Sequence, residues 1–357
     1  MNERILMKGN EAIAEAAIMA GCRQFFGYPI TPQNQIPEYM SKRMPQVGGT
    51  FLQSESEVAA INMVYGAAAA GGRVMTSSSS PGISLKQEGI SYIVGAELPA
   101  VIVNIVRGGP GLGGIQPAQC DYYQATRGGG HGDYRMVVLA PSTVQEAVEL
   151  TQEAFDIADY YRNPVMLLGD GMIGQMMEPV TMKPIEKREL PEKTWAATGW
   201  DGKSRPRAIL NSLFIDPAVL EQHNLKLQAK YAAMEKDEVR VEIDCPEDSE
   251  YIVVAYGTMA RIASKAISMA RAEGMKIGMV RPITLWPFPS QALKNCVTDK
   301  VKHVMTVELA AGQMLDDVRL SIGNNVPTSC YSRLGGMVPT SREIYEQFMK
   351  LGKGGNE

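Results

Sequence analysis

The sequence predicts an α/β protein in which a mostly parallel sheet, covered by helices on both sides, is followed by a smaller α/β domain. Apolar strand-like segments alternate with helical patterns through about the first 180 residues, the order that builds parallel sheets. The segment 100–106 is almost entirely apolar, as expected of a strand buried on both faces. The alternation resumes at residue 251 after a more polar stretch. Together these patterns indicate two α/β blocks.

The first block opens with a helix on a small-residue face and closes with a short strand. Ser142 is expected to cap its last helix, because Gln145 and Glu146 would then lie in the first turn. Helices are expected over 9–21, 58–70, 83–93 and about 142–161. Strands are expected over 24–28, 73–76, 100–106, 136–140 and 164–169.

The middle of the chain breaks this rhythm with charges, prolines and two tryptophans. It contains one polar helix-like stretch, 217–236, and is interpreted as an extended connector. The second block is expected to hold strands over 251–257, 276–280 and 303–307, with helices over 260–273 and 312–322. The predicted organisation is a first domain over 1–182, the connector over 183–248 and a second domain over 249–357.

Composition excludes several classes of protein. Hydrophobic residues make up 45% and charged residues 21%, which suits a globular chain with a large core. A net charge of −4 without a basic stripe argues against nucleic-acid binding. No apolar run approaches the ~20 residues that span a bilayer, and the first residues carry no secretion pattern, so no membrane contact and a cytoplasmic location are expected. The 5 cysteines are scattered without a Cys-x-x-Cys pair, which argues against a local zinc or iron–sulfur site.

Glu57 is the leading candidate for chemistry. It stands where a strand ends and an almost wholly apolar helix begins. One interpretation is structural: Ser54 caps the helix and Glu57 closes a capping box from the third helical position. The other is functional: a carboxylate in an apolar slot has a raised pKa and can share a proton with a ring nitrogen of a bound heterocycle. Both interpretations remain open from the residues alone.

Thr31 and Arg107 both follow strand-like segments. Thr31 is bracketed by Pro29-Ile30 and Pro32, which fix the backbone around it. Open α/β sheets bind ligands at the carboxyl ends of their strands, so the Thr31 hydroxyl could face a ligand. Arg107 could grip a carboxylate with two parallel hydrogen bonds. The alternatives are a rigid turn at Thr31 and a surface loop arginine at 107.

Two glycine-rich patterns resemble cofactor motifs but lack their context. Gly109, Gly111 and Gly114 fit a dinucleotide fingerprint, yet Pro110 lies inside it and no helix is expected to follow. The tripeptide 169–171 reads Gly-Asp-Gly, like the start of a magnesium-diphosphate motif, but no asparagine lies 25 to 30 residues later. It is interpreted as a strand-end turn. His131, in the glycine-rich loop 127–133, is interpreted as a solvated histidine.

An ordered set of short motifs runs through nearly the whole chain. Together they closely resemble the alpha-type subunit of 2-oxoacid:ferredoxin oxidoreductases, and most of all the 2-ketoisovalerate (3-methyl-2-oxobutanoate) branch. Each motif is weak by itself, but the ordered set is specific. The motifs are Gly9-Asn10-Glu11-Ala12, Gly27-Tyr28-Pro29-Ile30-Thr31-Pro32, Glu55-Ser56-Glu57, Ser80-Pro81-Gly82, Arg107-Gly108-Gly109-Pro110, His131-Gly132-Asp133 and Arg281-Pro282-Ile283-Thr284-Leu285-Trp286-Pro287-Phe288-Pro289.

The resemblance implies a shared thiamine diphosphate site. This chain would supply a pyrimidine-type domain followed by a transketolase-C-terminal-like domain. A beta subunit would hold the diphosphate and Mg²⁺. A gamma subunit and a ferredoxin-like delta subunit would complete the assembly, with [4Fe-4S] clusters in partner chains. Coenzyme A would be the co-substrate, and external ferredoxin would accept the electrons.

The resemblance also implies roles for three residues. Glu57 matches the glutamate that contacts the aminopyrimidine, and Thr31 and Arg107 match residues that contact the 2-oxoacid. Glu57 would share a proton with the pyrimidine ring, while the other two would hold the substrate carboxylate until carbon dioxide leaves. No role carries over to His131.

Three rival functions stay open from the sequence. The same chemistry could act on 2-oxoglutarate or pyruvate, and a second basic residue near Arg107 would favour a dicarboxylate. The loop 108–135 offers only Arg127 and Arg135 for that purpose. A second rival is a non-catalytic scaffold subunit. An NAD-dependent dehydrogenase is disfavoured by the broken glycine motif.

Overall fold

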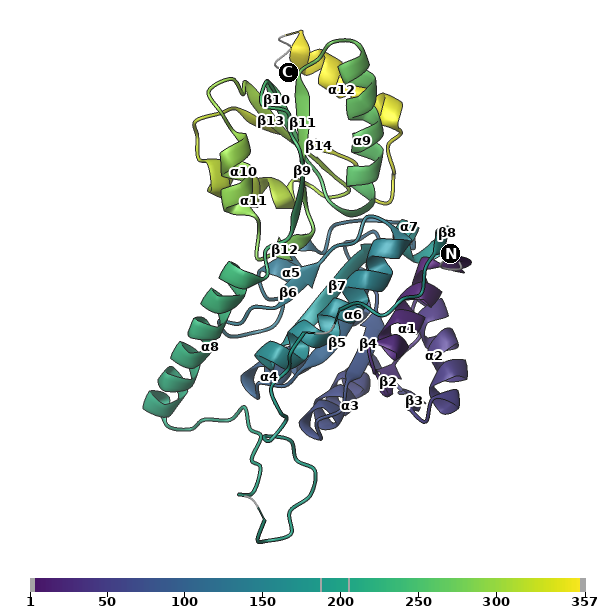
Figure 1. Cartoon of the computed structure of the whole chain (residues 1–357), viewed down its shortest axis with the longest axis vertical. Helices are drawn as coiled ribbons and strands as arrows, with labels where there is room; N and C mark the ends of the chain where they lie inside the picture. The colour runs from purple at the N-terminus through teal and green to yellow at the C-terminus, as the bar shows by residue number, and fades with distance from the viewer. Residues whose placement is uncertain (1–3, 187, 205, 354–357) are drawn as a thin grey trace.

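The computed structural model describes residues 4–186, 188–204 and 206–353. Two α/β domains are stacked along the long axis of the molecule (Figure 1). The larger one is built on a seven-stranded sheet and the smaller one on a five-stranded sheet. The predicted α/β fold class is confirmed.

The seven-stranded sheet has the order β12-β6-β7-β5-β4-β2-β3. Every neighbouring pair is parallel except β12 with β6. The central strands β5 and β7 are buried along their whole length, as their apolar sequences require. The strands are β2 (Gln24–Gly27), β3 (Thr50–Gln53), β4 (Val74–Ser78), β5 (Ala100–Val106), β6 (Val137–Leu139), β7 (Pro164–Asp170) and β12 (Thr284–Trp286).

Two groups of helices cover this sheet. Right-handed crossovers place α2 and α6 on one face and α3 and α4 on the other. The contacts agree, because α1 packs on both α2 and α6, whereas α3 packs on α4. These helices are α1 (Gly9–Met19), α2 (Gln35–Gln46), α3 (Glu57–Ala69), α4 (Ser80–Gly95) and α6 (Val144–Tyr161). Short helices α5 (Tyr122–Thr126) and α7 (Gly171–Gln175) and the antiparallel pair β1 (Ile5–Lys8) and β8 (Met177–Val180) complete the domain.

The cap of α6 differs from the prediction by one residue. Thr143, not Ser142, is the N-cap, and its hydroxyl accepts a 3.0 Å hydrogen bond from the backbone N–H of Glu146. The backbone N–H and the hydroxyl of Ser142 both donate to the Glu146 carboxylate. That carboxylate is also paired with Arg281 of the second domain at 2.9 Å. Arg281, from a distant segment of the chain, also binds the Glu146 carboxylate. The local sequence pattern therefore could not reveal how Glu146 is used.

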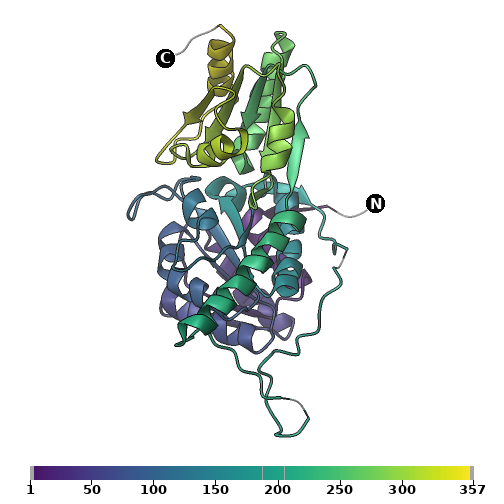
Figure 2. The same ribbon diagram turned by 90° about the vertical axis from the view of Figure 1, so that its left-hand side faces the viewer.

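The range assigned to the connector contains a long helix, α8 (Pro217–Asp237). It lies across the first domain, and the extended segment before it projects at the end of the molecule far from the second domain (Figure 2). Lys226 and Lys230 of α8 both pair with Glu97, which follows α4. Leu227, another α8 residue, is buried in the main core. The helix is therefore part of the first domain's packing.

The second domain has the strand order β14-β13-β10-β11-β9, with β9 antiparallel to β11 and the rest parallel. Helix α9 packs on α12, and α10 packs on α11. Two short strands do not follow the predicted domain ranges. Strand β9 lies within the range 183–248 but joins the sheet of the second domain, and β12 lies within 249–357 but joins the sheet of the first. The elements are β9 (Val241–Asp244), β10 (Tyr251–Val254), β11 (Ile277–Pro282), β13 (His303–Glu308), β14 (Thr328–Ser332), α9 (Gly257–Ala272), α10 (Ser290–Cys296), α11 (Gln313–Ile322) and α12 (Ser341–Gly352).

Gln119 joins the two domains. Its backbone N–H donates to the carbonyl of Leu309, and its side chain donates to the carbonyl of Tyr256 and accepts from the backbone N–H of Leu309, each at 3.0 Å. Gln119 is only 2% exposed, so these bonds lie inside the junction. The two domains are thus fixed to each other by buried hydrogen bonds as well as by the Arg281–Glu146 ion pair.

Candidate functional site at the carboxyl edge of the large sheet

The three candidate residues follow parallel strands of the same sheet. Thr31 lies after β2, Glu57 after β3 and Arg107 after β5. These strands occupy the consecutive positions β5-β4-β2-β3, with the Ser80-Pro81-Gly82 turn following β4 between them. Parallel strands bring their carboxyl ends to one edge, so the sheet gathers all of these segments.

Glu57 is the first residue of α3, and the cap is Ser56, whose hydroxyl accepts a 3.2 Å hydrogen bond from the backbone N–H of Ala59. The capping-box interpretation, with Ser54 as cap and Glu57 at the third position, is therefore wrong. The Ser54 hydroxyl is used elsewhere, because it donates to the carbonyls of Gly27 at 3.2 Å and Ser56 at 2.8 Å. The first contact fastens Ser54 to the end of β2.

The Glu57 side chain is buried, with 6% exposed. It rests against Gly82 in the first turn of α4: a Cβ added at Gly82 would lie 2.7 Å from Glu57 Oε1 and 2.1 Å from Ser78 Oγ. Only glycine leaves room there. Within the described residues, no protein group donates a hydrogen bond to the Glu57 carboxylate. The carboxylate oxygens are not among the buried atoms that lack a hydrogen-bond partner, so they keep access to the surface and can accept from an external partner.

Arg107 is also buried, with 6% exposed. Its guanidinium donates to the backbone carbonyl of Thr31 and to that of Leu112, each at 3.0 Å. Arg107 Nε has no hydrogen-bond partner in the described chain. An arginine carries five N–H donors, so this side chain is held in place by two of them and keeps others for a ligand. The structure thus brings Arg107 against the backbone of Thr31.

A polar network under the loop holds the backbone of Arg107. Its N–H donates to Ser80 Oγ at 3.1 Å, and the Ser80 N–H donates to Asn104 Oδ1 at 3.2 Å. Asn104 in turn donates to Asp121 Oδ2 at 2.9 Å. Burial raises the pKa of Asp121. Asn104 and Asp121 were not anticipated from the sequence, although Asn104, as the one polar residue in the apolar segment 100–106, was a usable signal.

The turn after β4 links the two halves of this site. Ser80 contacts the backbone of Arg107, and Gly82 lies against Glu57. The hydroxyls of Ser78 and Ser79 are buried without hydrogen-bond partners in the described chain. Further along the same helix, Lys86 Nζ is buried and also unpartnered. Orphaned polar atoms gathered at one edge of a sheet indicate a ligand-binding region.

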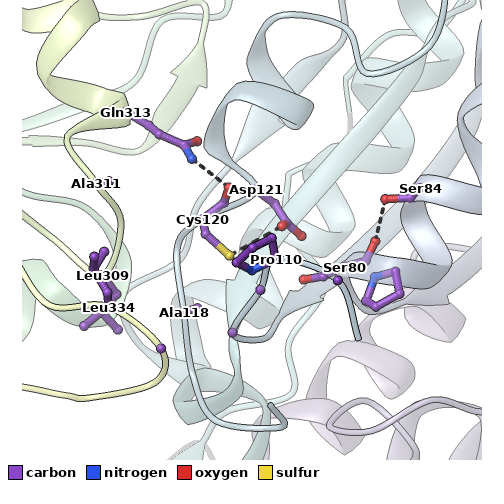
Figure 3. A pocket seen from close by; sticks show the side chains of 15 residues that line it. Ser80, Ser84, Pro110, Ala118, Cys120, Asp121, Leu309, Ala311, Gln313 and Leu334 are labelled. Carbon is purple, nitrogen blue, oxygen red and sulfur yellow. Dashed lines mark hydrogen bonds between the residues drawn. The ribbon is translucent and has the colours of Figure 1, made fainter. Parts of the chain in front are cut away.

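A cavity of about 400 Å³ opens beside this edge, between the two domains (Figure 3). Ser80, Pro110 and Asp121 line it from the first domain, while Gln313 and Leu334 reach it from the second. Gln313 also donates to the carbonyl of Cys120 at 2.9 Å, across the domain junction. The loop that carries Arg107 is therefore bounded by a cleft large enough for a small ligand.

The remaining motifs have structural explanations. Asp170 caps α7 by accepting from the backbone N–H groups of Met172 at 2.8 Å and Ile173 at 3.1 Å, which agrees with the strand-end interpretation. His131 is exposed, and its carbonyl accepts from Ser91. The glycine pattern around Gly111 lies in a loop without a helix. Across 4–186, 188–204 and 206–353 no cluster of potential metal ligands is found.

The same described ranges contain no helix with the length and apolar character needed to cross a bilayer. What the fold and site define is a two-domain α/β protein with a carboxyl group at Glu57 and a guanidinium at Arg107 along one edge of its large sheet. That arrangement suits an enzyme that binds a ligand at this edge of the sheet.

Comparison with known proteins agrees with this class. A family described as "Pyruvate flavodoxin/ferredoxin oxidoreductase, thiamine diP-bdg" matches residues 15–242, and "Pyruvate:ferredoxin oxidoreductase core domain II" matches residues 249–344. The chain belongs to this family and is a subunit of a 2-oxoacid:ferredoxin oxidoreductase. The predicted family is therefore confirmed.

Two curated relatives are named ketoisovalerate oxidoreductase subunit VorB. The protein from Methanothermobacter marburgensis is 47% identical and covers 99% of both chains. Its counterpart from Methanothermobacter thermautotrophicus is 49% identical and covers 97% of both. A 2-oxoglutarate synthase subunit KorA from the latter organism is 34% identical over 99% of this chain and 100% of its own length.

Among solved structures, the 2-oxoglutarate:ferredoxin oxidoreductase from Magnetococcus marinus superimposes with a TM-score of 0.87 at 25% identity. Its title records 2-oxoglutarate, coenzyme A and succinyl-CoA as bound. The present chain is covered to 98% and spans 65% of that longer chain. A split-gene transketolase beta4 tetramer has a TM-score of 0.57 at 14% identity, a likeness of fold alone.

Proposed function

We propose that this chain supplies the pyrimidine half of a thiamine diphosphate site in an enzyme that oxidatively decarboxylates a branched-chain 2-oxoacid, 3-methyl-2-oxobutanoate, to its acyl-coenzyme A. The observation that carries the proposal is Glu57: a buried carboxylate at the start of α3, packed on Gly82 and without a hydrogen-bond donor in the described protein. The family description, which names thiamine diphosphate binding, supports it.

The residues fit the pyrimidine end of that coenzyme. An aminopyrimidine ring presents a nitrogen that can share a proton with a carboxylate. The Glu57 carboxylate has no hydrogen-bond donor in the described protein, so it is available for this contact. When bound, thiamine diphosphate supplies the carbon nucleophile and the electron sink that decarboxylation needs. Glu57 would share a proton with that ring nitrogen as a positioned acid–base group.

Arg107 and Thr31 are suited to the substrate's carboxylate. Arg107 has donors left over after its bonds to the carbonyls of Thr31 and Leu112, and its Nε is unpartnered in the described chain. Charge-assisted hydrogen bonds from a guanidinium to a carboxylate are among the stronger ones in proteins. The Thr31 hydroxyl, which accepts a 3.3 Å hydrogen bond from Asn34, lies on the same turn as the carbonyl that anchors Arg107.

No cluster of potential metal ligands that could hold the Mg²⁺ of the diphosphate end is found among the described residues. Asp170 is the one acid in a Gly-Asp-Gly context, and its carboxylate is occupied in capping α7. The proposal therefore assigns the diphosphate and Mg²⁺ to a beta subunit. It also includes a gamma subunit, a ferredoxin-like delta subunit with [4Fe-4S] clusters, coenzyme A as acyl acceptor and external ferredoxin as electron acceptor. The word "subunit" in the relatives' names supports the existence of partner chains.

A branched monocarboxylate is favoured over 2-oxoglutarate on two grounds. The relatives at 47% and 49% identity are named for ketoisovalerate, whereas the 2-oxoglutarate synthase subunit stands at 34%. In addition, the basic residues available for a second carboxylate are engaged. Arg127 pairs with Asp317 at 3.0 Å, and Arg135 donates to the carbonyls of Arg127 and Tyr134. Pyruvate, a smaller 2-oxoacid, is the other alternative substrate for the same reaction.

The test uses the complex that co-purifies with this chain. Turnover is followed by viologen reduction with 3-methyl-2-oxobutanoate, 2-oxoglutarate and pyruvate, each with coenzyme A and thiamine diphosphate. The branched acid is expected to give the highest kcat/KM. Preference for 2-oxoglutarate would overturn the substrate assignment.

The role of Glu57 is tested in the same assay. Glu57→Gln is expected to leave the complex assembled and to lower kcat by about 10²-fold or more, the usual contribution of a positioned acid–base group. Glu55→Gln is a matched control, because Glu55 is exposed two residues away, and it is expected to keep full activity. Full activity in Glu57→Gln and Glu57→Ala would instead support a scaffold subunit.

A further inference from the structure

Arg107 lies just beyond the strand pairing between β4 and β5. The last residue of β5 that pairs with β4 is Asn104, opposite Ser78, so β4 offers no partner to the backbone of Arg107. The Ser80 hydroxyl takes that place. It accepts a 3.1 Å hydrogen bond from the Arg107 N–H and donates a 3.3 Å hydrogen bond to the Arg107 carbonyl. One side chain thus holds both polar groups of the Arg107 backbone.

Ser80 is itself held by a strand residue. It is the first residue of α4, and the first N–H groups of a helix have no partner within the helix. The N-cap residue, Ser79, makes no capping hydrogen bond with its side chain in the described chain. The Ser80 N–H instead donates to Asn104 Oδ1 at 3.2 Å. An amide from β5 therefore supplies the acceptor that a cap would normally give to α4.

The Asn104 amide is fixed by two hydrogen bonds. Asn104 is 0% exposed and lies in a strand whose other residues are apolar. A buried amide is costly unless its polar atoms find partners. Here Oδ1 accepts from Ser80, and Nδ2 donates to Asp121 Oδ2 at 2.9 Å. The amide cannot rotate without losing both bonds, so it sets the first turn of α4 against the end of β5.

The far end of the Arg107 side chain is fixed as well. Its guanidinium donates to the carbonyls of Thr31 and Leu112, each at 3.0 Å, and Nε has no partner in the described chain. Because backbone and guanidinium are both held, the remaining N–H groups keep one direction. A donor that is already in its bound geometry loses little conformational freedom when a ligand arrives, and this favours binding.

We propose that Ser80 is a positioning residue for the 2-oxoacid, which acts through Arg107, and that Asn104 supports it by holding the first turn of α4. The inference rests on the proposed function, because it takes Arg107 as the group that binds the substrate carboxylate. Ser80 places the Arg107 backbone, and the guanidinium makes the contact. A purely structural role of the same hydroxyl would change folding without changing substrate affinity.

The test measures substrate affinity in the complex purified through a tag on this chain. Isothermal titration calorimetry with 2-hydroxy-3-methylbutanoate, which has the carboxylate and the branched chain but no keto group, reports binding without turnover. Ser80→Ala is expected to weaken this binding about tenfold, because the Arg107 N–H loses its hydrogen-bond partner. In the viologen assay, KM for 3-methyl-2-oxobutanoate should rise by a similar factor while kcat stays near wild type. Asn104→Leu is expected to behave in the same way.

A double-mutant cycle separates positioning from a substrate contact made by Ser80 itself. Arg107→Met removes the cation that Ser80 places. Adding Ser80→Ala to Arg107→Met is therefore expected to change kcat/KM by less than about twofold. Ser80→Thr keeps the hydroxyl, and it is expected to recover most of the affinity that Ser80→Ala loses.

Ser91→Ala is the matched control. Ser91 lies near the other end of α4, and its hydroxyl donates to the carbonyl of His131 at 2.6 Å. The variant removes a serine hydroxyl from the same helix without touching the backbone of Arg107. Its affinity and KM are expected to stay within about twofold of wild type.

The outcomes distinguish the inference from the proposed function. Wild-type affinity in Ser80→Ala, together with weak binding in Arg107→Met, would overturn the inference and leave the proposed function standing. Additive losses in the cycle, an equal loss in Ser91→Ala or an equal loss in Ser80→Thr would also overturn it. If Asn104→Leu does not assemble, Ser80→Ala and the cycle decide the matter. Wild-type affinity and KM in Arg107→Met would overturn both the proposed carboxylate contact and the inference.

Discussion

The guanidinium of Arg107 donates a 3.0 Å hydrogen bond to the backbone carbonyl of Thr31, although 76 residues separate them in the chain. Their strands, β5 and β2, are separated in the sheet only by β4. The Ser80 hydroxyl, at the end of β4, accepts from the Arg107 backbone N–H at 3.1 Å. The turns after three adjacent strands are thus fastened together, and this fixes the guanidinium before any ligand binds.

Arg107→Lys is therefore expected to lower kcat/KM for the 2-oxoacid by about 10- to 100-fold. An ammonium cannot bond both carbonyls and still present a planar fork to a carboxylate, and losing one charge-assisted hydrogen bond costs about 1.5–3 kcal/mol. Steady-state viologen reduction measures the effect. Arg135→Lys, in the same loop region, should stay within about twofold of wild type. An Arg107→Lys enzyme as efficient as wild type would contradict the assigned contact.

Gly82→Ala should displace the Glu57 carboxylate without changing any charge. Its new Cβ would lie 2.7 Å from Glu57 Oε1 and 2.1 Å from Ser78 Oγ, so the carboxylate must move. We expect coenzyme affinity, measured by fluorescence titration of the complex, to fall at least tenfold. Gly352→Ala is the control, because Gly352 lies at the end of α12 and an added Cβ would meet only Met275 at 3.8 Å. Unchanged affinity in Gly82→Ala would mean that the coenzyme does not use Glu57.

Local patterns in the sequence were sufficient for most of the long elements, although the 12-residue helices α2 and α12 were not predicted. The alternation of apolar strands and helices predicted the α/β class, and strand-end turns pointed to Thr31 and Arg107 because parallel strands gather their carboxyl ends. The N-cap residue of α3 was harder to predict from the sequence. Ser54 and Ser56 both suit a cap, and Ser54 is excluded only by its hydrogen bond to Gly27 on β2, a contact across the sheet.

Other features depend on tertiary structure and leave little trace in the sequence. Strands β9 and β12 have only 4 and 3 residues, and their sheets are decided by the antiparallel partners β11 and β6. From the sequence alone, Lys86 would be placed on the exposed face of a helix, because lysine is usually exposed. Its burial follows from Gly82 and Gly89 bringing α3 close, which requires knowing that the two helices pack together.

The domain junction should be sensitive to Gln119. Gln119→Leu keeps the volume but leaves the carbonyl of Tyr256 and the N–H of Leu309 without the buried partners they now have. Each orphaned group costs about 1–3 kcal/mol, so the free energy of unfolding should fall by on the order of 2–4 kcal/mol. Urea denaturation followed by circular dichroism measures this. Gln291→Leu removes an exposed glutamine that donates a hydrogen bond to Asn295, and it should have little effect. Equal urea denaturation curves for the two variants would mean that the hydrogen bonds of Gln119 do not stabilise the domain junction.

Lys86 should make the chain less stable near neutral pH. Burial lowers the pKa of Lys86 to about 8, while Glu57 opposes this shift; in the unfolded chain the group titrates near 10.4. Because the folded state binds the proton less tightly, the penalty is fully present below pH 8 and disappears as pH rises from 8 to about 10.5. Lys86→Met is therefore expected to raise the unfolding free energy at pH 7 by on the order of 2–3 kcal/mol.

The advantage of Lys86→Met should shrink steadily between pH 8 and 10.5, as the wild-type lysine loses its proton in both states. Urea denaturation of both proteins at pH 7, 8, 9 and 10 measures the difference directly. A stabilised variant with altered coenzyme binding would identify Lys86 as a residue kept for function at the expense of stability. A Lys86→Met chain that is less stable than wild type at pH 7 would mean that the ammonium has a stabilising partner, and the description of an unpaired buried cation would be wrong.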